Sequence, residues 1–258
     1  MNRQNNEKIN QLYLCLPEGV ISPSKWLQDK GYSRQRIYSY VEGGWLKSVG
    51  KGAYSRPTTE VNWQGLVASW QHIEREAYHV GGETALNVQG FSHYLRLAGE
   101  NLIYLIGSSK VPSWVRNVAL DVPLRTVHKQ LFRDVPKNVG FIEMKSPIKD
   151  WLLKVSSPER AIMEMLVFVK DEFSFIFAAD LMEGLTTLRP NVVNELLHAC
   201  RHVAVKRLFL FLAEYYKHPW IKAIDKDVIG LGKGKRRIVD KGKLNKAYLI
   251  TVPERFNA

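Results

Sequence analysis

The sequence predicts an α+β fold, and three observations indicate it. The first 56 residues alternate helical patterns with turns and end in two short β-rich runs joined by glycines. Residues 101–155 hold several apolar, β-rich runs separated by prolines, which is typical of strands. From residue 157 to 216, apolar residues recur with helical periodicity. We therefore expect a small N-terminal domain, 1–58, and a mixed α/β domain, 59–258, divided near residue 156 into a sheet part and a mostly helical part.

Composition restricts the class of protein. With 258 residues, 45% apolar and 24% charged, the chain is typical of globular proteins and not of disordered ones. No apolar run approaches the roughly 20 residues that a membrane span needs, and the polar N-terminus does not resemble a signal peptide. Its two cysteines cannot form a disulfide framework. We expect a cytoplasmic protein with no membrane contact.

The distribution of charge is informative. The net charge is +12, of which residues 1–56 carry +5 and residues 217–258 carry +7, while residues 57–216 are neutral. Lysine and arginine that neutralise phosphates supply most non-specific nucleic-acid affinity, so this pattern favours a polyanion-binding protein. A solubilising surface charge is the alternative.

The N-terminal segment has the order of a winged helix-turn-helix. Helical periodicity covers 5–16, and Ser22-Pro23 and Ser33 are typical helix starts. The second start opens a helix with Ile37, Tyr38 and Val41 as its expected apolar side, followed by a β-hairpin over 45–56.

In that fold the last helix enters the DNA major groove with its N-terminal residues. Arginine pairs well with guanine and glutamine with adenine, while wing residues meet phosphates or the minor groove. The predicted DNA-binding residues are Ser33, Arg34, Gln35, Arg36, Ser39, Lys47, Lys51 and Arg56. A winged-helix adaptor without a DNA role remains an alternative.

The rest of the chain is predicted as helices over 61–77 and 84–88, then strands over 101–107, 118–122, 139–144 and 151–155 in a mixed or antiparallel sheet. Helices over 158–169, 173–182, 191–199 and 203–216 follow, the last of them central because it is apolar on most sides. The tail, 221–252, has strand character around a basic loop.

This basic tail is a second candidate surface for a polyanion, carried by Lys233, Lys235, Arg236, Arg237, Lys241 and Lys243, with Lys246 nearby. Lysines that protect an edge strand from pairing are the alternative interpretation. The glycine-rich run 230–235 lacks the spacing of a phosphate-binding loop. We read it as a turn that presents basic side chains.

Two further patterns suggest other chemistry. His198 and His202, with Cys200 between them, could clamp a metal from one helix, but no third ligand follows at regular spacing. Asp121, Glu143 and Lys145 could form a Mg²⁺-dependent nuclease site, since Glu143 and Lys145 share one strand face. We regard the nuclease as the enzymatic alternative and otherwise expect no enzyme, no cofactor and no metal.

Several local patterns, taken in order, resemble the AbiEi family of antitoxins from type IV toxin–antitoxin and phage abortive-infection systems. They are Gly44-Trp45-Leu46 with Gly50-Lys51-Gly52-Ala53-Tyr54, the segment 78–86 with Thr84 where serine is usual, Ser156-Ser157-Pro158-Glu159-Arg160-Ala161, the segment 231–236, and 248–253. The resemblance covers most of the chain.

The resemblance implies a transcriptional autorepressor that binds operator DNA in its own promoter. It also implies neutralisation of a cognate nucleotidyltransferase-like toxin encoded beside it, for which the C-terminal region is needed. Whether the toxin is bound directly, and whether the protein binds DNA as a dimer or cooperatively, stay open.

Overall fold

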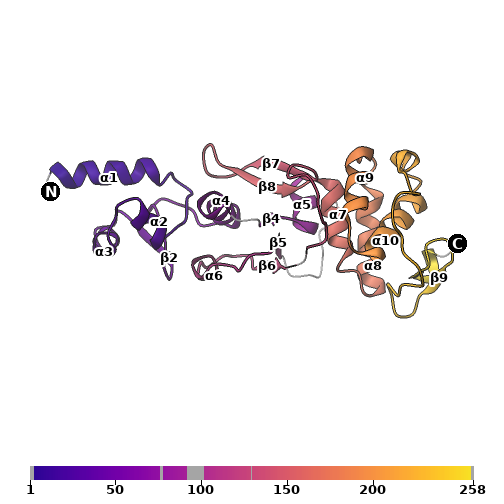
Figure 1. Ribbon diagram of the computed structural model, residues 1–258. Coiled ribbons are helices and arrows are strands. Elements are labelled where there is room, and N and C mark those ends of the chain that lie inside the picture. Colours follow the sequence, from indigo (N-terminus) through magenta and orange to yellow (C-terminus); the bar gives the residue numbers. More distant parts are fainter. Residues whose placement is uncertain (1–2, 76–77, 92–101, 129, 257–258) are drawn as a thin grey trace. The chain divides into compact units, whose positions relative to one another are not determined.

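The computed structural model describes residues 3–75, 78–91, 102–128 and 130–256 (Figure 1). Its contacts divide the chain into two compact units. Unit 1 comprises 1–79, 101–128 and 143–154, and unit 2 comprises 80–100, 129–142 and 155–258. The predicted domain boundary at residue 58 falls inside unit 1 and stays a prediction. Within the described ranges, no helix is long and apolar enough to cross a membrane.

The N-terminal part of unit 1 has the expected winged helix-turn-helix order. Its elements are α1 (Arg3–Cys15), β1 (Ser22–Pro23), α2 (Ser24–Asp29), α3 (Arg34–Glu42), β2 (Lys47–Gly50) and β3 (Ala53–Ser55). The three strands form an antiparallel sheet in the order β1-β3-β2. One detail differs from the sequence prediction, since Ser22 and Pro23 pair with β3 and the helix begins only at Ser24.

Apolar side chains from all three helices and the hairpin fill one small core. The side chains of Leu12, Leu16, Ile21, Leu27, Ile37, Leu46 and Ala53 are buried there. The prediction of Tyr38 as a core residue of α3 was wrong, because its side chain is 67% exposed whereas Tyr40 is buried. Residues 37, 40 and 41 and residues 37, 38 and 41 fit helical spacing equally well, so periodicity alone cannot choose between the two tyrosines.

The remainder of unit 1 packs around α4 (Trp63–Glu74), whose first turn is capped by Asn62 accepting from the Gly65 amide. The Trp114 indole of α6 (Ser113–Arg116) donates to Glu74 at 2.6 Å, and His72 stacks on Trp151. The strand predicted over 118–122 is irregular, and the strand β6 lies instead at Leu124–Val127. Two predicted element ends, Ala77 and Asn101, lie outside the described residues.

The largest sheet is mixed, which is one of the two forms, mixed or antiparallel, that the sequence predicts. Its strands are β4 (His79–Val80), β5 (Ile103–Ile106), β6, β7 (Phe141–Lys145) and β8 (Leu152–Ser156), in the order β6-β5-β4-β8-β7. β5 pairs with β6 and β4 pairs with β8, in both cases parallel. β6 and β7 are therefore the two edge strands.

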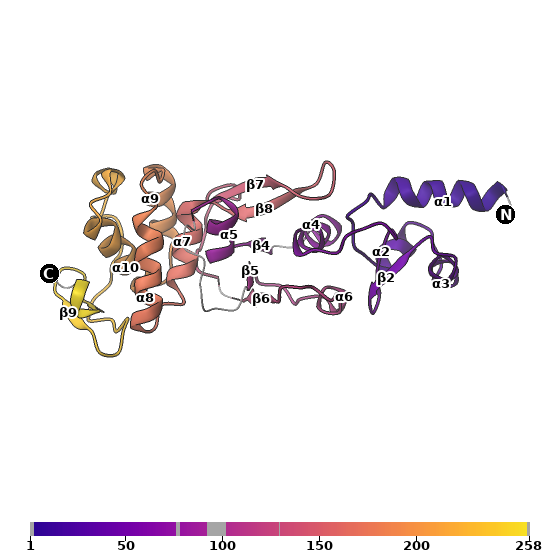
Figure 2. The same ribbon diagram turned by 180° about the vertical axis from the view of Figure 1, so that it is seen from behind.

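Unit 2 is mostly helical, as the periodicity of 158–216 predicted (Figures 1 and 2). Its helices are α5 (Gly82–Val88), α7 (Pro158–Leu166), α8 (Glu172–Glu183), α9 (Pro190–Ala199) and α10 (Val203–Tyr215). α10 is buried along most of its length and contacts both α7 and α8, which confirms its central position. In α7, Glu164 accepts hydrogen bonds from the Gly82 amide, the Ser156 hydroxyl and Arg160, and so joins α5, β8 and α7.

The tail of unit 2 is less regular than predicted. It consists of two 3₁₀ turns (Pro219–Ala223 and Glu254–Phe256) and a short antiparallel hairpin, β9 (Lys243–Asn245) and β10 (Ile250–Val252). The basic residues 233–237 therefore lie mainly in a loop and not on a strand. Within the part of the chain that the structure describes, their one regular backbone pairing is an isolated β-bridge between Arg236 and Ile250.

Candidate nucleic-acid interface

The start of α3 is set by a side-chain cap. Ser33 has an extended backbone, and its hydroxyl accepts a hydrogen bond from the Arg36 amide at 3.3 Å. This contact satisfies one of the amide groups that a helix leaves unpaired at its N-terminus. The cap therefore fixes where the helix begins and which residues form its first turn.

The orientation of α3 follows from its buried side. Ile37 and Tyr40 are buried, so residues on the opposite side of the helix face solvent. Gln35 and Ser39 are exposed on that side, and Arg34 is exposed in the first turn, one turn before Ile37. Three of the hydrogen-bonding side chains predicted from sequence are therefore exposed on α3.

Arg36 and Tyr38 behave differently from these residues. The Arg36 side chain is only half-buried and lies near Tyr40. Burial raises the hydroxyl pKa of Tyr40, and the Arg36 charge offsets only part of this rise. Tyr38 is exposed on the same helix and was missed as a candidate contact, because its aromatic ring fitted the predicted core stripe. Its exposure adds an aromatic ring to the candidate surface.

The wing is a tight hairpin. β2 and β3 pair in antiparallel register, with an irregularity between Ser48 and Gly50. Gly52 has a backbone φ of +78°, a conformation that residues other than glycine rarely adopt. Lys47 and Lys51 are exposed, so both predicted wing lysines are accessible to a ligand.

Arg56 has an internal role in the structure. Its Nε donates to the Leu16 carbonyl oxygen at 2.6 Å, its Nη2 donates to that of Tyr13, and the guanidinium stacks on the Tyr13 ring at 4.5 Å. These carbonyls belong to the end of α1, where the helix has no partners of its own for them. We therefore leave Arg56 out of the DNA surface proposed below.

The glycine-rich loop of the tail is folded around an arginine that sequence analysis missed. The Arg207 side chain of α10 is 2% exposed. Its guanidinium donates to the carbonyl oxygens of Leu231 (2.9 Å), Gly232 (3.0 Å), Gly234 (2.7 Å) and Leu249 (3.3 Å). A phosphate-binding loop turns its amide groups toward the ligand, whereas this loop turns its carbonyls toward a cation. Nothing in the sequence pattern links residues this far apart.

The basic residues of the tail have unequal surroundings. Arg237 forms an ion pair with Asp240 at 2.9 Å, and Lys243 forms one with Glu254. Arg236 is half-buried. Lys233 and Lys235 are exposed at the turn of the glycine-rich loop.

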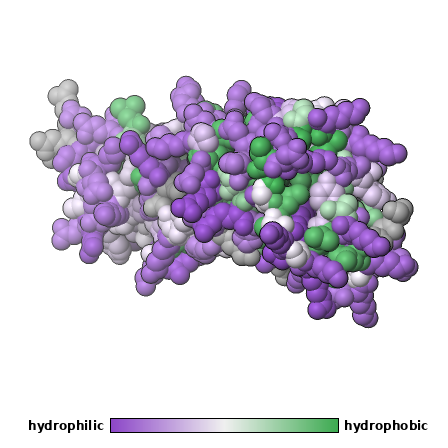
Figure 3. All heavy atoms as spheres, turned by 45° about the vertical axis from the view of Figure 1, so that its right-hand side comes forward, coloured by the Kyte–Doolittle hydropathy of each residue, from purple (hydrophilic) through white to green (hydrophobic). Residues whose placement is uncertain are grey.

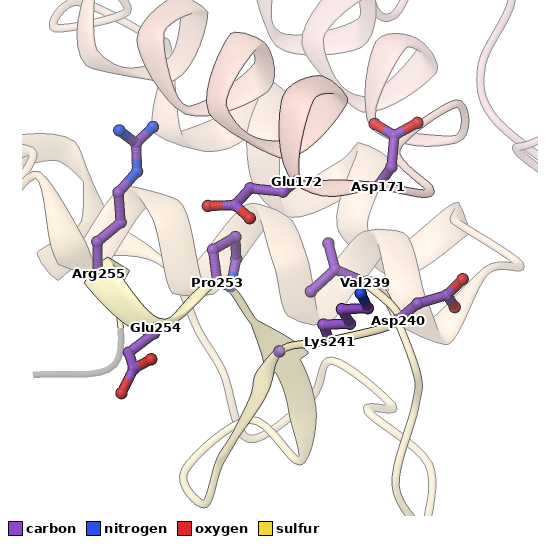
Figure 4. Close-up of a pocket in the computed structure, with 9 residues that line it drawn as sticks. Asp171, Glu172, Val239, Asp240, Lys241, Pro253, Glu254 and Arg255 are labelled. Atoms are coloured by element: carbon purple, nitrogen blue, oxygen red, sulfur yellow. The ribbon is translucent and has the colours of Figure 1, made fainter.

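Lys241 lies among carboxylates. It borders a cavity of about 640 Å³ whose rim also includes four acids, Asp171, Glu172, Asp240 and Glu254, and one further base, Arg255. Figure 4 shows the two acids at the start of α8 across this cavity from the tail. The local field at Lys241 is therefore less positive than the sequence suggests, and the basic surface is concentrated at Lys233 and Lys235.

The residues of the nuclease alternative are not assembled. Asp121 precedes β6, whereas Glu143 and Lys145 lie on β7, at the other edge of the five-stranded sheet. Four strand spacings of about 4.8 Å separate those edges by roughly 19 Å. The described residues contain no group of three or more His, Cys, Asp or Glu that could hold a metal. The geometry gives this alternative no support.

The histidine pair also departs from prediction. His198 and His202 were expected on one helix, but α9 ends at Ala199 and His202 precedes α10. Cys200 between them is buried, and its backbone pairs with that of Phe132 in an isolated antiparallel β-bridge. Burial raises the pKa of the Cys200 thiol to about 11. A buried thiol of this kind is a poor metal ligand because the thiolate is the ligand form.

Comparison with known proteins agrees with the resemblance in the sequence. A family model described as "Transcriptional regulator, AbiEi antitoxin, Type IV TA system" matches residues 100–253. A second, described as "Transcriptional regulator, AbiEi antitoxin N-terminal domain", matches residues 5–97. A search of curated protein sequences gave no match.

The fold is similar to a solved structure, the crystal structure of the RV2827C protein from Mycobacterium tuberculosis. The TM-score is 0.54 at 14% sequence identity, and the match covers 90% of this chain and 86% of that one. At this identity the likeness concerns the fold alone. Together the two family models span nearly the whole sequence, and the chain belongs to the AbiEi antitoxin family of transcriptional regulators of type IV toxin–antitoxin systems.

Proposed function

We propose that this protein represses the promoter of its own operon by binding an operator through α3 and the wing, and that it neutralises a nucleotidyltransferase-like toxin from the same operon. The main support for the promoter-binding part of this proposal is the set of exposed residues on α3. Gln35 and Ser39 are exposed opposite the buried Ile37 and Tyr40, and Arg34 is exposed in the first turn of the same helix. A cytoplasmic location is part of this proposal.

The chemistry of that face suits base edges. Arginine can bond guanine through two donors and glutamine can bond adenine in the same bidentate way, so Arg34 and Gln35 are the proposed base readers. Lys47 and Lys51 on the wing are proposed phosphate contacts, which position the protein without reading sequence.

The test is a binding titration of the full-length protein on its own promoter and on unrelated DNA, each at two salt concentrations. Arg34→Ala should weaken promoter binding by roughly 5- to 150-fold, equivalent to about 1–3 kcal/mol, and unrelated DNA much less. Lys149→Ala removes one exposed positive charge from the β7–β8 turn and is the matched control.

Two results would contradict the DNA-binding proposal. Equal losses on both DNAs for Arg34→Ala would make Arg34 a phosphate contact and remove its role in reading bases. Absence of promoter binding by the wild type at low salt would leave the winged-helix adaptor as the function of this domain.

The tail loop is proposed as a second polyanion contact. Lys233 and Lys235 are exposed, and beneath them Lys206 and Arg207 place two more positive charges against the same loop. Positive charges held close together are stabilised when an anion binds. Double charge reversal, Lys233→Glu with Lys235→Glu, should weaken nucleic-acid binding at low salt, whereas Lys222→Glu on the neighbouring 3₁₀ turn should not.

Toxin neutralisation is assigned to unit 2 in this proposal. Its helices are densely apolar, and its positive charge is gathered at the tail loop and the adjoining part of α10. The side chains of Phe173, Tyr215 and Val228 are exposed on it. Independently of these residues, Figure 3 shows apolar residues gathered between hydrophilic ones on one face of the molecule. Gathered apolar surface is typical of protein contacts.

Separation of the two activities tests this assignment. The operator-binding variant Arg34→Ala, co-expressed with the toxin from a promoter that the protein does not control, should still protect cells. Loss of protection would mean that DNA binding belongs to the antitoxin mechanism itself.

A further inference from the structure

The tip of the wing is held by a segment far away in the sequence. The side-chain amide of Asn117, directly after α6, donates from Nδ2 to the Lys51 carbonyl oxygen at 3.1 Å. The two residues are 66 positions apart and belong to the same compact unit. Figures 1 and 2 show α6 and the hairpin labelled β2 next to each other in both views. In this protein α6 therefore supports the wing.

The contact is close enough to require a glycine. A Cβ atom added at Gly50 would lie 2.3 Å from the Asn117 carbonyl oxygen, a backbone atom that cannot rotate away. The backbone of the wing thus packs directly on the end of α6. This packing fixes the wing tip at a defined position on unit 1.

α6 itself is firmly anchored. Trp114 and Val115 are buried, and the Trp114 indole donates to Glu74 of α4. Val118, just after Asn117, is buried as well. The wing is consequently connected through α6 to the helix α4, and its position does not depend on the hairpin alone.

The same short helix exposes an arginine beside the wing. Arg116 directly precedes the residue that bonds Lys51, and its side chain is exposed. Its backbone amide donates to the Pro112 carbonyl oxygen, but within the described ranges its guanidinium has no hydrogen bond or ion pair. Arg116 also borders a cavity of about 360 Å³ that is lined mainly by apolar residues.

We propose that Arg116 contacts a DNA phosphate next to the one neutralised by Lys51, so that α6 and the wing form one phosphate-binding edge beside α3. The inference rests on the proposed DNA binding and adds to it a residue outside the winged helix. An arginine with an exposed guanidinium, on a fixed element and without an internal anion, is suited to a phosphate.

The physical signature of such a contact is its effect on salt dependence. Each neutralised phosphate releases condensed counterions, so the slope of log K against log salt changes by about 0.9 per contact on duplex DNA. Arg116→Ala should reduce the magnitude of this slope by about one and weaken promoter and unrelated DNA to the same extent. A contact to a base would weaken the two DNAs unequally.

The experiment measures the salt dependence of promoter binding for full-length variants, with folding checked by circular dichroism. Arg116→Ala should lower the slope, Arg116→Lys should restore most of it because the charge returns, and Lys149→Ala should leave it unchanged. Asn117→Ala should lower affinity a few-fold at every salt concentration with an unchanged slope, because it loosens the wing without removing a charge.

The outcomes separate this inference from the proposed function. A wild type that binds no DNA overturns both. Promoter binding whose slope responds to Lys51→Ala but not to Arg116→Ala overturns the inference alone. A slope lowered equally by Lys149→Ala would show only the loss of overall charge and would overturn it as well.

Discussion

The Arg189 guanidinium donates two hydrogen bonds to the carboxylate of Glu159, from Nε to Oε1 at 2.9 Å and from Nη2 to Oε2 at 3.0 Å. The Arg189 amide and the Ser157 hydroxyl donate to the same carboxylate. Burial by itself works to raise the pKa of Glu159, but these hydrogen bonds outweigh it and hold the pKa below its ordinary value. One buried carboxylate thus joins the start of α7 to the start of α9.

The first prediction concerns the pH dependence of stability. Because the folded-state pKa of Glu159 is depressed, its contribution is present above the unfolded-state pKa of about 4.3 and is lost as pH falls through the folded value. Glu159→Gln should cost roughly 1–2 kcal/mol at pH 7, since a charged hydrogen-bond network is lost.

Urea unfolding at pH 7 and pH 4 measures this effect. The difference between wild type and Glu159→Gln should shrink at pH 4, and Glu195→Gln, an exposed substitution on α9, should show no such change. A difference that is the same at both pH values would contradict the assigned role of the charge.

The second prediction concerns Arg207. Replacing it with methionine keeps an unbranched chain but leaves the carbonyl oxygens of Leu231, Gly232 and Gly234 without their donor, whereas that of Leu249 keeps its hydrogen bond from the Arg236 amide. We expect a loss of about 2–5 kcal/mol in the free energy of unfolding, because unpaired buried polar groups are costly. Arg207→Lys keeps the charge but cannot reach all four oxygens, so its free energy of unfolding should lie between those of the wild type and Arg207→Met.

Chemical denaturation checks this order, with Arg201→Met as the control because Arg201 is exposed. If Arg207→Met were as stable as the wild type, the loop would be held by other contacts.

The third prediction compares two glycines of the wing. Gly50→Ala should displace the wing, since its Cβ would meet the Asn117 carbonyl oxygen at 2.3 Å. Gly52→Ala meets no atom within 4 Å but must adopt a φ of +78°. It should therefore cost only about 1 kcal/mol of strain. Hydrogen exchange of the Lys51 and Ala53 amides should rise more in Gly50→Ala than in Gly52→Ala, and the reverse order would contradict the packing described here.

The fourth prediction concerns thiol reactivity. Burial raises the pKa of Cys200 to about 11 and also raises that of Cys15. Since the thiolate is the reactive form, a disulfide reagent at pH 8 should modify Cys200 only slowly in the native protein and quickly after unfolding. A fast native reaction that persists in Cys15→Ser would show that Cys200 is accessible.

Much of the fold could be predicted because its signals are local. Ser33 and Ser157 marked the starts of α3 and α7, and apolar periodicity located α8 to α10 within one or two residues. Caps and periodicity depend on neighbouring residues, so a single sequence contains them.

The errors have a common physical cause. The strand at Leu124–Val127, the irregular tail and the roles of Arg56 and Arg207 all depend on partners distant in sequence. The same holds for the candidate site. Arg34, Gln35 and Ser39 were predicted from their place in the first turns of α3, whereas the hydrogen bond from Asn117 to Lys51 joins positions 66 apart and has no local signal.

The hydrogen bonds of Arg207 have a consequence for synthesis on the ribosome. The carbonyl groups that surround this guanidinium lie 24 to 42 residues downstream of it. While that downstream chain is still inside the ribosomal tunnel, α10 carries an arginine that cannot be buried without its acceptors. The full set of carbonyl partners of Arg207 is therefore present only after Leu249 has emerged. A nascent chain that stalls before residue 231 has none of them, so the Arg207 side chain stays in water.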